Sequence, residues 1–572
     1  MNKSKTRGFA PQSEWKNVNW RKLEMTVFKL QKRIYRASQR GDVHVVRKLQ
    51  KTLMKSWSAK MIAVRRVTQE NKGKKTAGID GVKALTNKQR LTLVASLKIS
   101  KKAQPTRRVW IPKPGRTEKR PLGIPTMYDR ALQALTKQAL EPEWEAKFEP
   151  NSYGFRPGRS CHDAIEAIFK GINQKPKWVL DADIAKCFDK INHDALLSKL
   201  NTYPSLRRII RSWLRAGVID NGTFLSTNEG TPQGGVISPL LANIALHGME
   251  ERIKHYAETL KGSKISNKKA LNLIRYADDF VIMHKDRIVV EECQRIINEW
   301  LKNMGLELKP SKTRITYTLD GFDFLGFNIR QYKTGKNQSK QGFKTIIKPS
   351  KEKILEHYGQ LAEVIKQHRA APQEALISHL KPIIRGWCNY YSGVCSKETF
   401  NDLGFMLWNN LKRWGYRRHP NKSRTWANKK YWGTKIEKAE KPWESPKVDN
   451  WVFMTKEGNH LPKHAKTKII RHTKVRDTRS PYDGDLIYWS FRMRKHPEMT
   501  SQKGRLLKRQ EGKCTHCGLT FRHGDLLEKH HIIPRGLGGN DLDKNLELLH
   551  LHCHDIKHGT KINSNELDEN PF

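Results

Sequence analysis

The chain has 572 residues, of which 37% are hydrophobic and 9% are aromatic. That length is too great for one hydrophobic core and predicts roughly three or four domains of about 100–200 residues each, while the apolar content excludes a fully disordered chain. Lys and Arg number 109 against 56 Asp and Glu, so the formal net charge is +53, which disfavours a neutral-surfaced metabolic enzyme and indicates a polyanionic partner, most simply nucleic acid.

The N-terminal part of the chain has helical periodicity. Apolar residues recur at helical spacing between Leu23 and Leu53, and a Gly- and Lys-rich break follows at 71–81. We assign 1–70 to a helical N-terminal extension. Residues 71–345 mix short β-type runs with helical stretches, which predicts an α+β region.

Acidic residues accompany two of these β-type runs. Along Trp178–Ile184, alternation places Asp181 and Asp183 on one face of a strand. Tyr276-Ala-Asp-Asp279 lies between two apolar runs, which predicts a hairpin with both carboxylates at its tip. A lone Asp-Asp pair is usually a polar turn, but repelling carboxylates gathered in one place require cations. Two Mg²⁺ ions held by Asp side chains activate a primer 3′-hydroxyl and stabilise a pyrophosphate leaving group.

Helical periodicity returns after residue 345, and a strongly basic stretch follows. We assign 346–435 to a helical domain and 436–500 to a small basic domain or linker. Residues 411–480 contain 20 Lys and Arg against 6 Asp and Glu, with tryptophans among them. A charge run is usually a solvated face, but basic side chains neutralise phosphates and aromatic rings stack on unpaired bases, which favours nucleic-acid binding here.

The eight cysteines do not form a disulfide scaffold over this length, and three of them crowd into the tail at 501–572. Cys514-Thr-His-Cys517 is followed by His530-His531, by Asn545 and by His550-Leu-His-Cys553-His554. A lone Cys-x-x-Cys is a weak signal, whereas this ordered set indicates a metal-binding domain.

At Asp183-Ile-Ala-Lys-Cys-Phe-Asp189 and Tyr276-Ala-Asp-Asp279 the chain resembles reverse transcriptases. At Pro382-Ile-Ile-Arg-Gly-Trp-Cys-Asn-Tyr-Tyr391 it resembles, more specifically, the group II intron-encoded maturase family, and the resemblance covers nearly the whole chain. It implies a right-hand polymerase fold with fingers and palm in 71–345, an α-helical thumb called domain X in 346–435, and a DNA-binding region in 436–500. It assigns two Mg²⁺ ions to Asp183, Asp278 and Asp279, with Asp181 as a neighbour.

The same resemblance implies a nucleotide pocket for the incoming dNTP. Its expected residues are Lys113, Arg120, Phe188, Gln233 and Lys312. The two basic fingers residues would contact the triphosphate, Phe188 would exclude the ribose 2′-hydroxyl, Gln233 would touch nucleotide and template, and Lys312 would lie near the leaving group. The alternative interpretations are a solvated basic hairpin, an ordinary core Phe and a plain glycine-containing turn.

The tail resembles the HNH nuclease family. This resemblance implies a ββα-metal fold with a structural zinc on Cys514, Cys517, His550 and Cys553, where His552 is the alternative to His550. It also implies a second divalent ion on His530 and His554, whose identity as Mg²⁺, Mn²⁺ or Ni²⁺ stays open. His531 would act as the general base and Asn545 would orient it. The alternative is a purely structural zinc knuckle.

The family also implies RNA contacts on the thumb and on the basic run after it. We expect them at Arg385, Lys412, Arg413, Arg417, Arg418 and Lys422. Trp387, in the middle of the thumb motif, is expected to pack within the thumb instead.

As a whole, the resemblance implies an RNA-directed DNA polymerase, a maturase that assists splicing of its intron RNA, and an endonuclease that nicks target DNA to prime reverse transcription. Two alternatives are a splicing-only RNA-binding maturase and a domesticated or defence-associated reverse transcriptase without an intron partner. No secretory signal or membrane span is predicted. The expected location is therefore a bacterial cytoplasm, near the nucleoid, or an organellar matrix.

Overall fold

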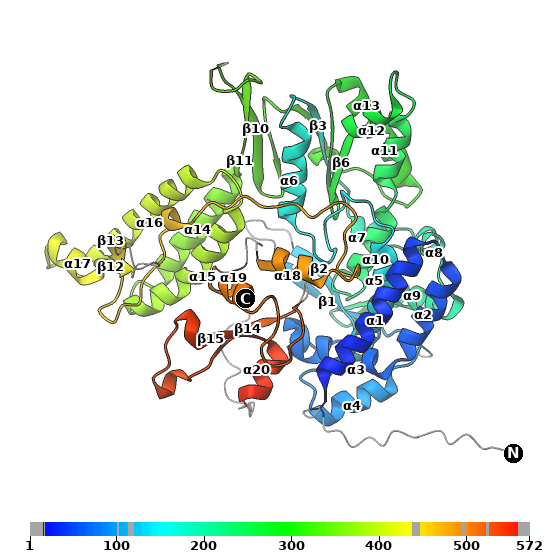
Figure 1. Ribbon diagram of the computed structural model, residues 1–572, viewed down its shortest axis with the longest axis horizontal. Coiled ribbons are helices and arrows are strands. Elements are labelled where there is room, and N and C mark those ends of the chain that lie inside the picture. The colour runs from blue at the N-terminus through cyan, green and yellow to red at the C-terminus, as the bar shows by residue number, and fades with distance from the viewer. Residues whose placement is uncertain are drawn as a thin grey trace.

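The computed structural model describes residues 15, 18–99, 102–112, 119–335, 337–437, 447–494, 499, 501–521 and 525–558. Figure 1 shows the N-terminal helices and the fingers on one side, the palm sheet beside them, the helical thumb at the opposite side, and the C-terminal domain below the palm and thumb. Helices and strands alternate through the first two thirds of the chain, in agreement with the predicted α+β class.

Three helices form the N-terminal extension: α1 (Trp20–Gln39), α2 (Val43–Lys55) and α3 (Trp57–Arg65). The first two begin where a side chain satisfies a free backbone N–H: Asn19 accepts from Lys22, and Asp42 accepts from Val45. Their apolar faces pack with α5 (Met127–Glu145) in a core that continues into the palm. A further helix, α4 (Asn87–Ser96), begins with a capping box.

The fingers contain a four-stranded sheet in the order β2-β1-β4-β5. Strand β1 (Thr106–Pro112) pairs antiparallel with β2 (Lys119–Ile124) and parallel with β4 (Val218–Asp220), which in turn pairs with β5 (Thr223–Leu225). Lys113, predicted to bind nucleotide, lies outside the described residues, whereas Arg120 lies on β2.

The palm is an antiparallel sheet in the order β6-β7-β3-β8, whose strands are Asn272–Tyr276, Asp279–His284, Trp178–Asp183 and Arg314–Tyr317. Alternation sends Leu180 and Phe280 into a core shared with α13 (Arg287–Lys302). It sends Val179 and Val281 into a second core, shared with α6 (Cys161–Ile172). On this second face, the ends of β3 and β7 carry aspartates in place of apolar residues.

Further helices surround the palm and connect it to the fingers. They are α7 (Cys187–Lys190), α8 (His193–Leu200), α9 (Pro204–Leu214), α10 (Ser238–Leu246), α11 (Met249–Ala257) and α12 (Lys264–Ala270). Of these, α8, α9 and α10 contribute most of their apolar residues to the core shared with the N-terminal helices.

A three-stranded antiparallel sheet of β9 (Phe322–Phe324), β10 (Phe327–Lys333) and β11 (Phe343–Pro349) leads from the palm into the thumb. The thumb helices are α14 (Lys351–Gln367), α15 (Gln373–Tyr391), α16 (Lys397–Arg417) and α17 (Arg424–Tyr431). Trp387 of α15 stacks on His357 of α14 with 4.5 Å between ring centroids, which is the packing role expected for it.

Strands β12 (Trp432–Glu437) and β13 (Lys447–Phe453) form a hairpin beside α16. Residues 454–485, which we call the strap, then run across the palm (Figure 1) with only one short helical turn at His464–Lys466. Buried Asp163 of α6 fixes the strap by accepting hydrogen bonds from the Val475 backbone at 2.8 Å and the His472 ring at 3.1 Å. The described part of 436–500 thus shares the palm and thumb core, and its DNA-binding role stays a prediction.

Helix α18 (Leu486–Arg494) follows the strap, and its Trp489 still packs in the palm and thumb core. The C-terminal domain comprises α19 (Ser501–Arg509), β14 (Leu527–His531), β15 (Leu546–His550) and α20 (Leu551–His558). It has a small core of its own around Leu506, Phe521 and Leu548. The domain lies against the N-terminal helices, where Arg66 and Asp525 line one shared cavity of about 70 Å³. Among the described residues, no helix is both long and apolar enough to cross a membrane.

Candidate functional site

Three carboxylates lie at one end of the palm sheet. Asp183, the last residue of β3, pairs across the strands with Asp279, the first residue of β7, and the Cβ atoms of such partners are about 4.5–5.5 Å apart. Asp278 lies in the two-residue turn between β6 and β7, and its carbonyl accepts a hydrogen bond from the Ile184 backbone at 3.3 Å. The structure therefore contains the hairpin with its acidic tip and places Asp183 beside it.

A buried arginine supports this tip. Arg275 is fully buried and donates to the Ala277 carbonyl in the turn at 3.1 Å, to the Asn243 side chain at 3.0 Å and to the Ser152 hydroxyl at 2.7 Å. Ala277 has a φ of +59°, which is uncommon for a non-glycine residue, and these contacts hold it there. Sequence reasoning missed Arg275, because a basic residue inside an apolar strand gives no indication of what it contacts.

Gly154 allows a second segment to approach the tip. A Cβ at this position would lie 2.3 Å from the Ala277 nitrogen, which is shorter than any tolerable contact. Its carbonyl accepts from the Asn243 side chain at 2.8 Å. Asn243 therefore links the Gly154 loop to Arg275, so the carboxylate turn is fixed from two sides.

The carboxylates are buried and repel one another. Burial, followed by the charges of Asp278 and Asp183, raises the pKa of Asp279 to about 7. Burial also raises the pKa of Asp278 and, with a contribution from Asp183, raises the pKa of Asp181 to about 7. The Lys312 ammonium lies 2.7 Å from Asp183 Oδ2 and offsets part of this charge. Clustered carboxylate oxygens with too little positive charge fit a site for hard divalent cations.

Two of the residues predicted for the nucleotide pocket influence the carboxylates at this end of the sheet. The positive charges of Lys312 and Arg120 oppose the rise that burial causes in the pKa of Asp278. Gln233 donates to the Asp189 carboxylate at 3.2 Å and accepts from the Gly123 backbone of β2 at 2.6 Å. Phe188 is half-buried and lies edge-on to Phe155 at 6.0 Å. The loop that contains Gln233 thus joins the palm to the fingers.

Glycine is required in that loop. Gly230 has a φ of +81°, and a Cβ there would lie 2.5 Å from the Asp189 carbonyl. The neighbouring Thr231 N–H donates to the Phe188 carbonyl at 2.5 Å. The backbone of this loop therefore lies in close contact with the segment that carries Phe188.

The predicted RNA-binding residues of the thumb differ in their surroundings. Arg385, Arg413, Arg417 and Lys422 are exposed, and the Lys412 ammonium lies 3.5 Å above the Trp408 ring. Arg418 donates to the carbonyls of Arg369 at 2.6 Å and Ala371 at 2.9 Å, and its guanidinium covers Trp414. Arg418 therefore joins the end of α16 to the loop between α14 and α15, and its predicted RNA contact stays a prediction.

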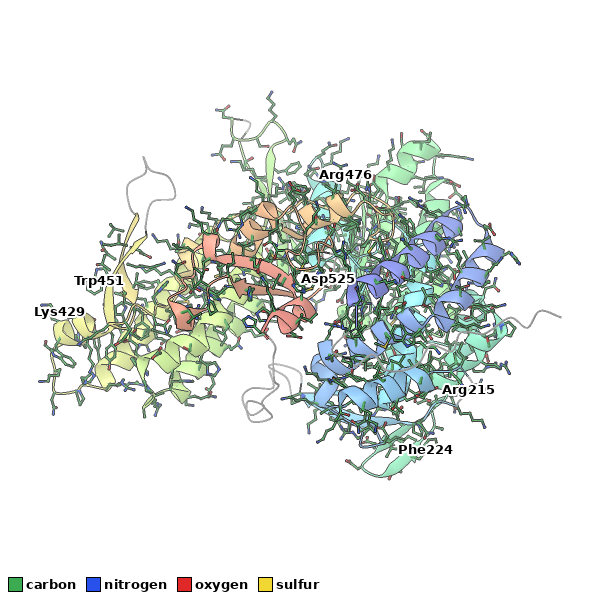
Figure 2. The ribbon with its side chains drawn as sticks, turned by 60° about the horizontal axis from the view of Figure 1, so that its bottom comes forward. Arg215, Phe224, Lys429, Trp451, Arg476 and Asp525 are labelled. Carbon is green, nitrogen blue, oxygen red and sulfur yellow. The ribbon has the colours of Figure 1, made fainter. Side chains whose placement is uncertain are left out.

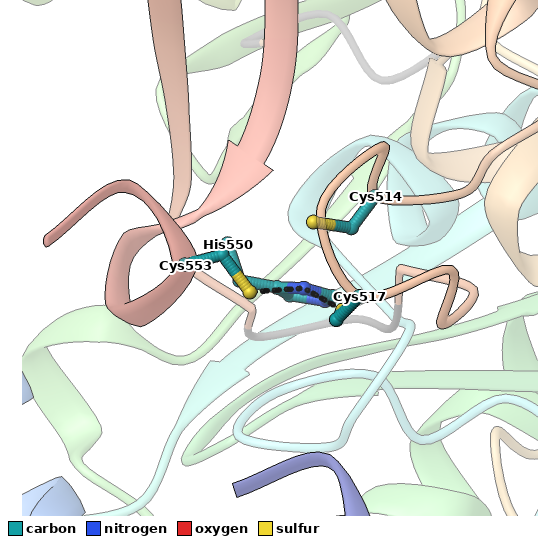
Figure 3. A group of neighbouring side chains, drawn as sticks. All are labelled: Cys514, Cys517, His550 and Cys553. Atoms are coloured by element: carbon teal, nitrogen blue, oxygen red, sulfur yellow. Dashed lines mark hydrogen bonds between the residues drawn. The ribbon is translucent and has the colours of Figure 1, made fainter. Parts of the chain in front are cut away.

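Four metal-type ligands converge in the C-terminal domain, as Figure 3 shows. Cys514, Cys517, Cys553 and His550 each offer a ligand atom, and these atoms lie within 4.8 Å of one another. Hydrogen bonds with Cys517 and Cys553 lower the pKa of Cys514, which favours the thiolate that zinc requires. The geometry thus includes His550, while the side chain of His552 lies outside the described residues.

Asp525, which sequence reasoning missed, contacts the histidine of this cluster. His550 Nδ1 is 3.4 Å from Cys517 Sγ, while its Nε2 is 3.4 Å from Asp525 Oδ2. A carboxylate on the second ring nitrogen fixes the tautomer and orientation of a metal-binding histidine. Asp525 lies on the segment before β14, which no ligand spacing would have selected.

A second cluster contains His530 of β14 with His554 and His558 of α20, whose ring nitrogens also lie within 4.8 Å of one another. His530 Nδ1 is 2.8 Å from His558 Nε2. Burial, then neighbouring positive charge, lowers the pKa of His530 and of His554, which favours the neutral, metal-binding imidazole. His558 was not among the predicted ligands, although its spacing from His554 places both on one helix face.

His531 projects from the same strand as His530 and contacts a carboxylate. Its Nε2 lies 2.7 Å from Asp541 Oδ1, and Arg535 donates to the same carboxylate at 2.7 Å. The hydrogen bond from Arg535, then that from His531, lowers the pKa of Asp541 to about 2. Asp541 is therefore a charged partner that orients the His531 ring.

Asn545 holds the loop after His531 in place through hydrogen bonds to its backbone. Its side-chain oxygen accepts from the Ile533 N–H at 2.8 Å, and its amide nitrogen donates to the carbonyls of Ile533 at 3.0 Å and Asn540 at 2.9 Å. A Cβ on Gly539 would collide with the Ile533 carbonyl, so this packing also requires glycine. Asn545 thus positions the backbone of the loop after His531, and its predicted role of orienting the general base stays a prediction.

A palm with clustered carboxylates, a basic helical thumb and a ββα domain with two metal-type clusters define a nucleic-acid polymerase joined to a nuclease. Family models match four successive parts of the chain: "N-terminal domain of reverse transcriptase" at 15–97, "Reverse transcriptase (RNA-dependent DNA polymerase)" at 111–329, "Group II intron, maturase-specific domain" at 354–432 and "HNH endonuclease" at 514–560.

Individual proteins also resemble large parts of the chain. The chain is 30% identical over 419 residues to the group II intron-encoded protein LtrA of Lactococcus lactis subsp. cremoris, covering 59% of this chain and 69% of that protein. It is 34% identical over 302 residues to protein YkfC of Escherichia coli K12, covering 46% and 78%. The chain belongs to the family of group II intron-encoded proteins. The predicted fold class, the reverse transcriptase and endonuclease activities and the maturase domain are thereby confirmed.

Proposed function

We propose that Asp183, Asp278 and Asp279 hold the divalent ions of the polymerase, as a pair of Mg²⁺ ions. The single observation that supports this most strongly is the strand register that sets Asp183 opposite Asp279, with Asp278 in the adjoining turn. Ions bound there supply activation of the primer 3′-hydroxyl and stabilisation of the leaving pyrophosphate. Arg275 holds the turn in place, and Lys312 balances the charge of Asp183.

The residues around the carboxylates bind the dNTP. The planar guanidinium of Arg120 donates paired hydrogen bonds to the triphosphate, and the Lys113 ammonium contributes a positive charge. Gln233 contacts the incoming nucleotide and the template from the loop that joins palm to fingers, and Phe188 excludes the ribose 2′-hydroxyl. The half-buried position of Phe188 beside Phe155 supports a ring held at a fixed place on the pocket wall.

In the C-terminal domain, Cys514, Cys517, His550 and Cys553 hold a structural zinc. His530, His554 and His558 hold a second divalent ion, which stabilises the phosphate charge that develops during cleavage. His531 removes a proton from the attacking water, and Asp541 orients it. The nitrogen-rich ligand set suits Mn²⁺ or Ni²⁺ as well as Mg²⁺.

The nucleic-acid partners are a group II intron RNA and a target DNA. The maturase-specific match and the exposed basic residues of the thumb support RNA binding, and the nuclease domain supports a DNA target. The clustered palm carboxylates argue against a splicing-only maturase, while the maturase and nuclease domains together argue against a reverse transcriptase without an intron partner.

A reconstitution with the full chain tests this proposal. A transcript of the intron that surrounds the gene is expected to splice faster with the protein at low Mg²⁺. The resulting particle is expected to nick a DNA duplex containing the ligated exons and to extend the nicked strand with dNTPs. Absence of both splicing stimulation and cDNA would refute the proposal, whereas splicing alone would favour the splicing-only maturase.

Mg²⁺ is expected to stabilise the chain more strongly as the pH rises through 7. The folded-state pKa of Asp279 is about 7, whereas an unfolded Asp titrates near 4. Between these values the folded chain holds a proton that the unfolded chain has lost, so without Mg²⁺ its stability falls as the pH rises. Mg²⁺ binds the ionised carboxylates and thereby offsets this loss of folding stability.

Thermal unfolding of the full chain at about pH 6 and about pH 8, with and without Mg²⁺, measures this effect. Asp279→Asn is expected to make the gain in unfolding temperature from Mg²⁺ nearly the same at the two pH values. Asp320→Asn, which removes an exposed carboxylate from a turn after β8, is the matched control and is expected to preserve it. An equal gain from Mg²⁺ at both pH values would contradict the assignment.

Replacement of Arg413, Arg417 and Lys422 by alanine together is expected to weaken RNA binding and flatten its salt dependence. Six or more phosphate contacts give a log–log slope steeper than roughly −4 for single strands, and the loss of three contacts reduces it by about 2. Titrations of single-stranded RNA at several salt concentrations provide the slope. Arg418→Ala is the contrasting variant, expected to lower thermal stability and leave the slope unchanged; a flattened slope for Arg418→Ala alone would reverse the two roles.

A further inference from the structure

A groove of about 700 Å³ lies between α16, the β12–β13 hairpin and the start of the strap. Its floor is apolar and belongs to the thumb core, with Leu407, Trp432 and Phe453 buried. Its volume falls within the ~300–1,000 Å³ typical of small-ligand sites. No residue assigned so far to polymerase or nuclease chemistry lines it.

Three aromatic rings line the rim of this groove, of which Trp408 also packs against the thumb core. Phe405 is 63% exposed and Trp451 is 55% exposed, and Trp408 is half-buried between rim and floor. The rings of Phe405 and Trp408 are stacked, with 6.2 Å between centroids and 29° between planes. Large aromatic side chains gathered on an exposed surface mark an interaction site.

Trp451 is held in an uncommon backbone conformation. Its φ is +56°, which is a true outlier for a bulky residue. It lies at the bulge in the β12–β13 hairpin, where the register shifts between Gly433 and Lys435. The bulge accommodates this conformation and leaves the Trp451 side chain exposed at the groove. Strained residues of this kind cluster at ligand-binding sites.

The charge around the groove identifies the kind of ligand. None of the described residues that line it is acidic, and Lys412 supplies a positive charge there. Lys463 is paired with Asp449 at 2.9 Å, and burial lowers the pKa of His464 to about 4, so these two residues add little charge to the groove. The surrounding segments, 397–437 and 447–466, carry 14 Lys and Arg against 5 Asp and Glu. Figure 2 places Trp451 and Lys429 at the same end of the molecule, far from Phe224 in the fingers. Apolar rings within a cationic surface fit a polyanion that carries flat apolar faces.

We propose that this groove binds an unpaired nucleotide of RNA, with the base stacked on the Phe405, Trp408 and Trp451 rings and the phosphate beside Lys412. The choice of RNA rests on the proposed function, because α16 belongs to the segment that matches the maturase-specific domain. Stacking requires an unpaired base, since a base within a duplex has both faces covered. The groove therefore distinguishes single-stranded from double-stranded RNA.

Equilibrium binding to the full chain tests this inference with three probes of one sequence: a 12-nucleotide single-stranded RNA, its blunt duplex, and the single-stranded DNA. Phe405→Ala/Trp451→Ala and Trp408→Ala are expected to weaken single-stranded RNA binding by about tenfold, within the range seen for stacked bases. Duplex binding and the salt slope should not change, because no charge is removed. Trp408→Phe is expected to retain most of the binding and shows that the fold tolerates substitution there.

Phe224→Ala is the matched control, since Phe224 is 57% exposed, close to the value for Trp451, and lies at the opposite end of the molecule. It is expected to bind all three probes as the unmodified chain does. Ultraviolet crosslinking of the single strand containing 5-iodouridine is expected to label Phe405, Trp408 or Trp451.

Equal losses for single strand and duplex, no loss, or a loss confined to DNA would each overturn the proposal. The binding assay contains no dNTP, so failure of the polymerase assignment would be recorded separately, as absence of cDNA from the unmodified chain.

Discussion

Asp278→Ala is expected to lower cDNA synthesis by about a thousandfold or more while leaving splicing within about twofold of the unmodified protein. Asp278 lies in the two-residue turn beside the Asp183–Asp279 pair, where burial, then the charge of Asp183, raises its pKa. Its substitution deletes a proposed metal ligand without touching the hydrogen bonds that Arg275 makes to Ala277, Asn243 and Ser152. The chemistry is therefore lost and the hairpin is retained.

Primer extension on an RNA template and splicing of the intron transcript, both with the same protein preparation, measure the two effects. Asp320→Asn serves again as the control for loss of one acidic group near the palm. A parallel fall in splicing would mean that Asp278 supports the fold of the RNA-binding surface. Retention of cDNA synthesis would remove Asp278 from the set of metal ligands.

The carboxylate hairpin was predictable because its signals are local. Alternation fixed which face of β3 carries Asp183, and the two apolar runs around Ala277 and Asp278 allowed only a short turn. Sequence alone left open the register between β3 and β7, which the structure supplies by pairing Asp183 with Asp279. Arg275 was not predictable, since its partners lie 32 and 123 residues away in the sequence.

In the C-terminal domain, too, the groups with local sequence signals were predictable and their partners from other segments were not. The order of cysteines and histidines predicted both clusters, because metal ligands recur at spacings set by short loops and one helical turn. The two carboxylates that orient the histidines, Asp525 and Asp541, follow no such spacing. Asn545 was predicted to orient His531, but sequence does not reveal that its amide contacts three backbone groups of the same loop.

The strap and the groove could not be predicted at all. The sequence of 436–500 reads as a basic linker, because extended segments that pack against other domains lack periodicity. Its anchor, the buried Asp163 on α6, is about 310 residues earlier in the chain. The strap leads from the thumb to the C-terminal domain and is bound to the palm through Asp163. It therefore connects the polymerase part of the chain to the nuclease domain.

His531→Ala is expected to lower nicking of target DNA by about 10²–10⁴-fold and to leave extension from a pre-annealed primer unchanged. The His531 ring is positioned by Asp541, whose own pKa is lowered to about 2 by Arg535 and His531. Asp541 is thus ionised throughout the assay range and does not itself titrate there. His530, His554 and His558 remain to bind the divalent ion, so the variant separates loss of the base from loss of the metal.

A comparison of two acidic residues in the same loop sharpens this test. Asp541→Asn is expected to reduce nicking less than His531→Ala does, because the ring keeps its place in the strand but loses the carboxylate that orients it. Asp543→Asn removes a carboxylate that pairs with Arg505 instead, and it is expected to leave the nicking rate unchanged. Persistent nicking by His531→Ala would refute the base assignment, and equal nicking rates for both aspartate variants would show that Asp541 does not orient the ring.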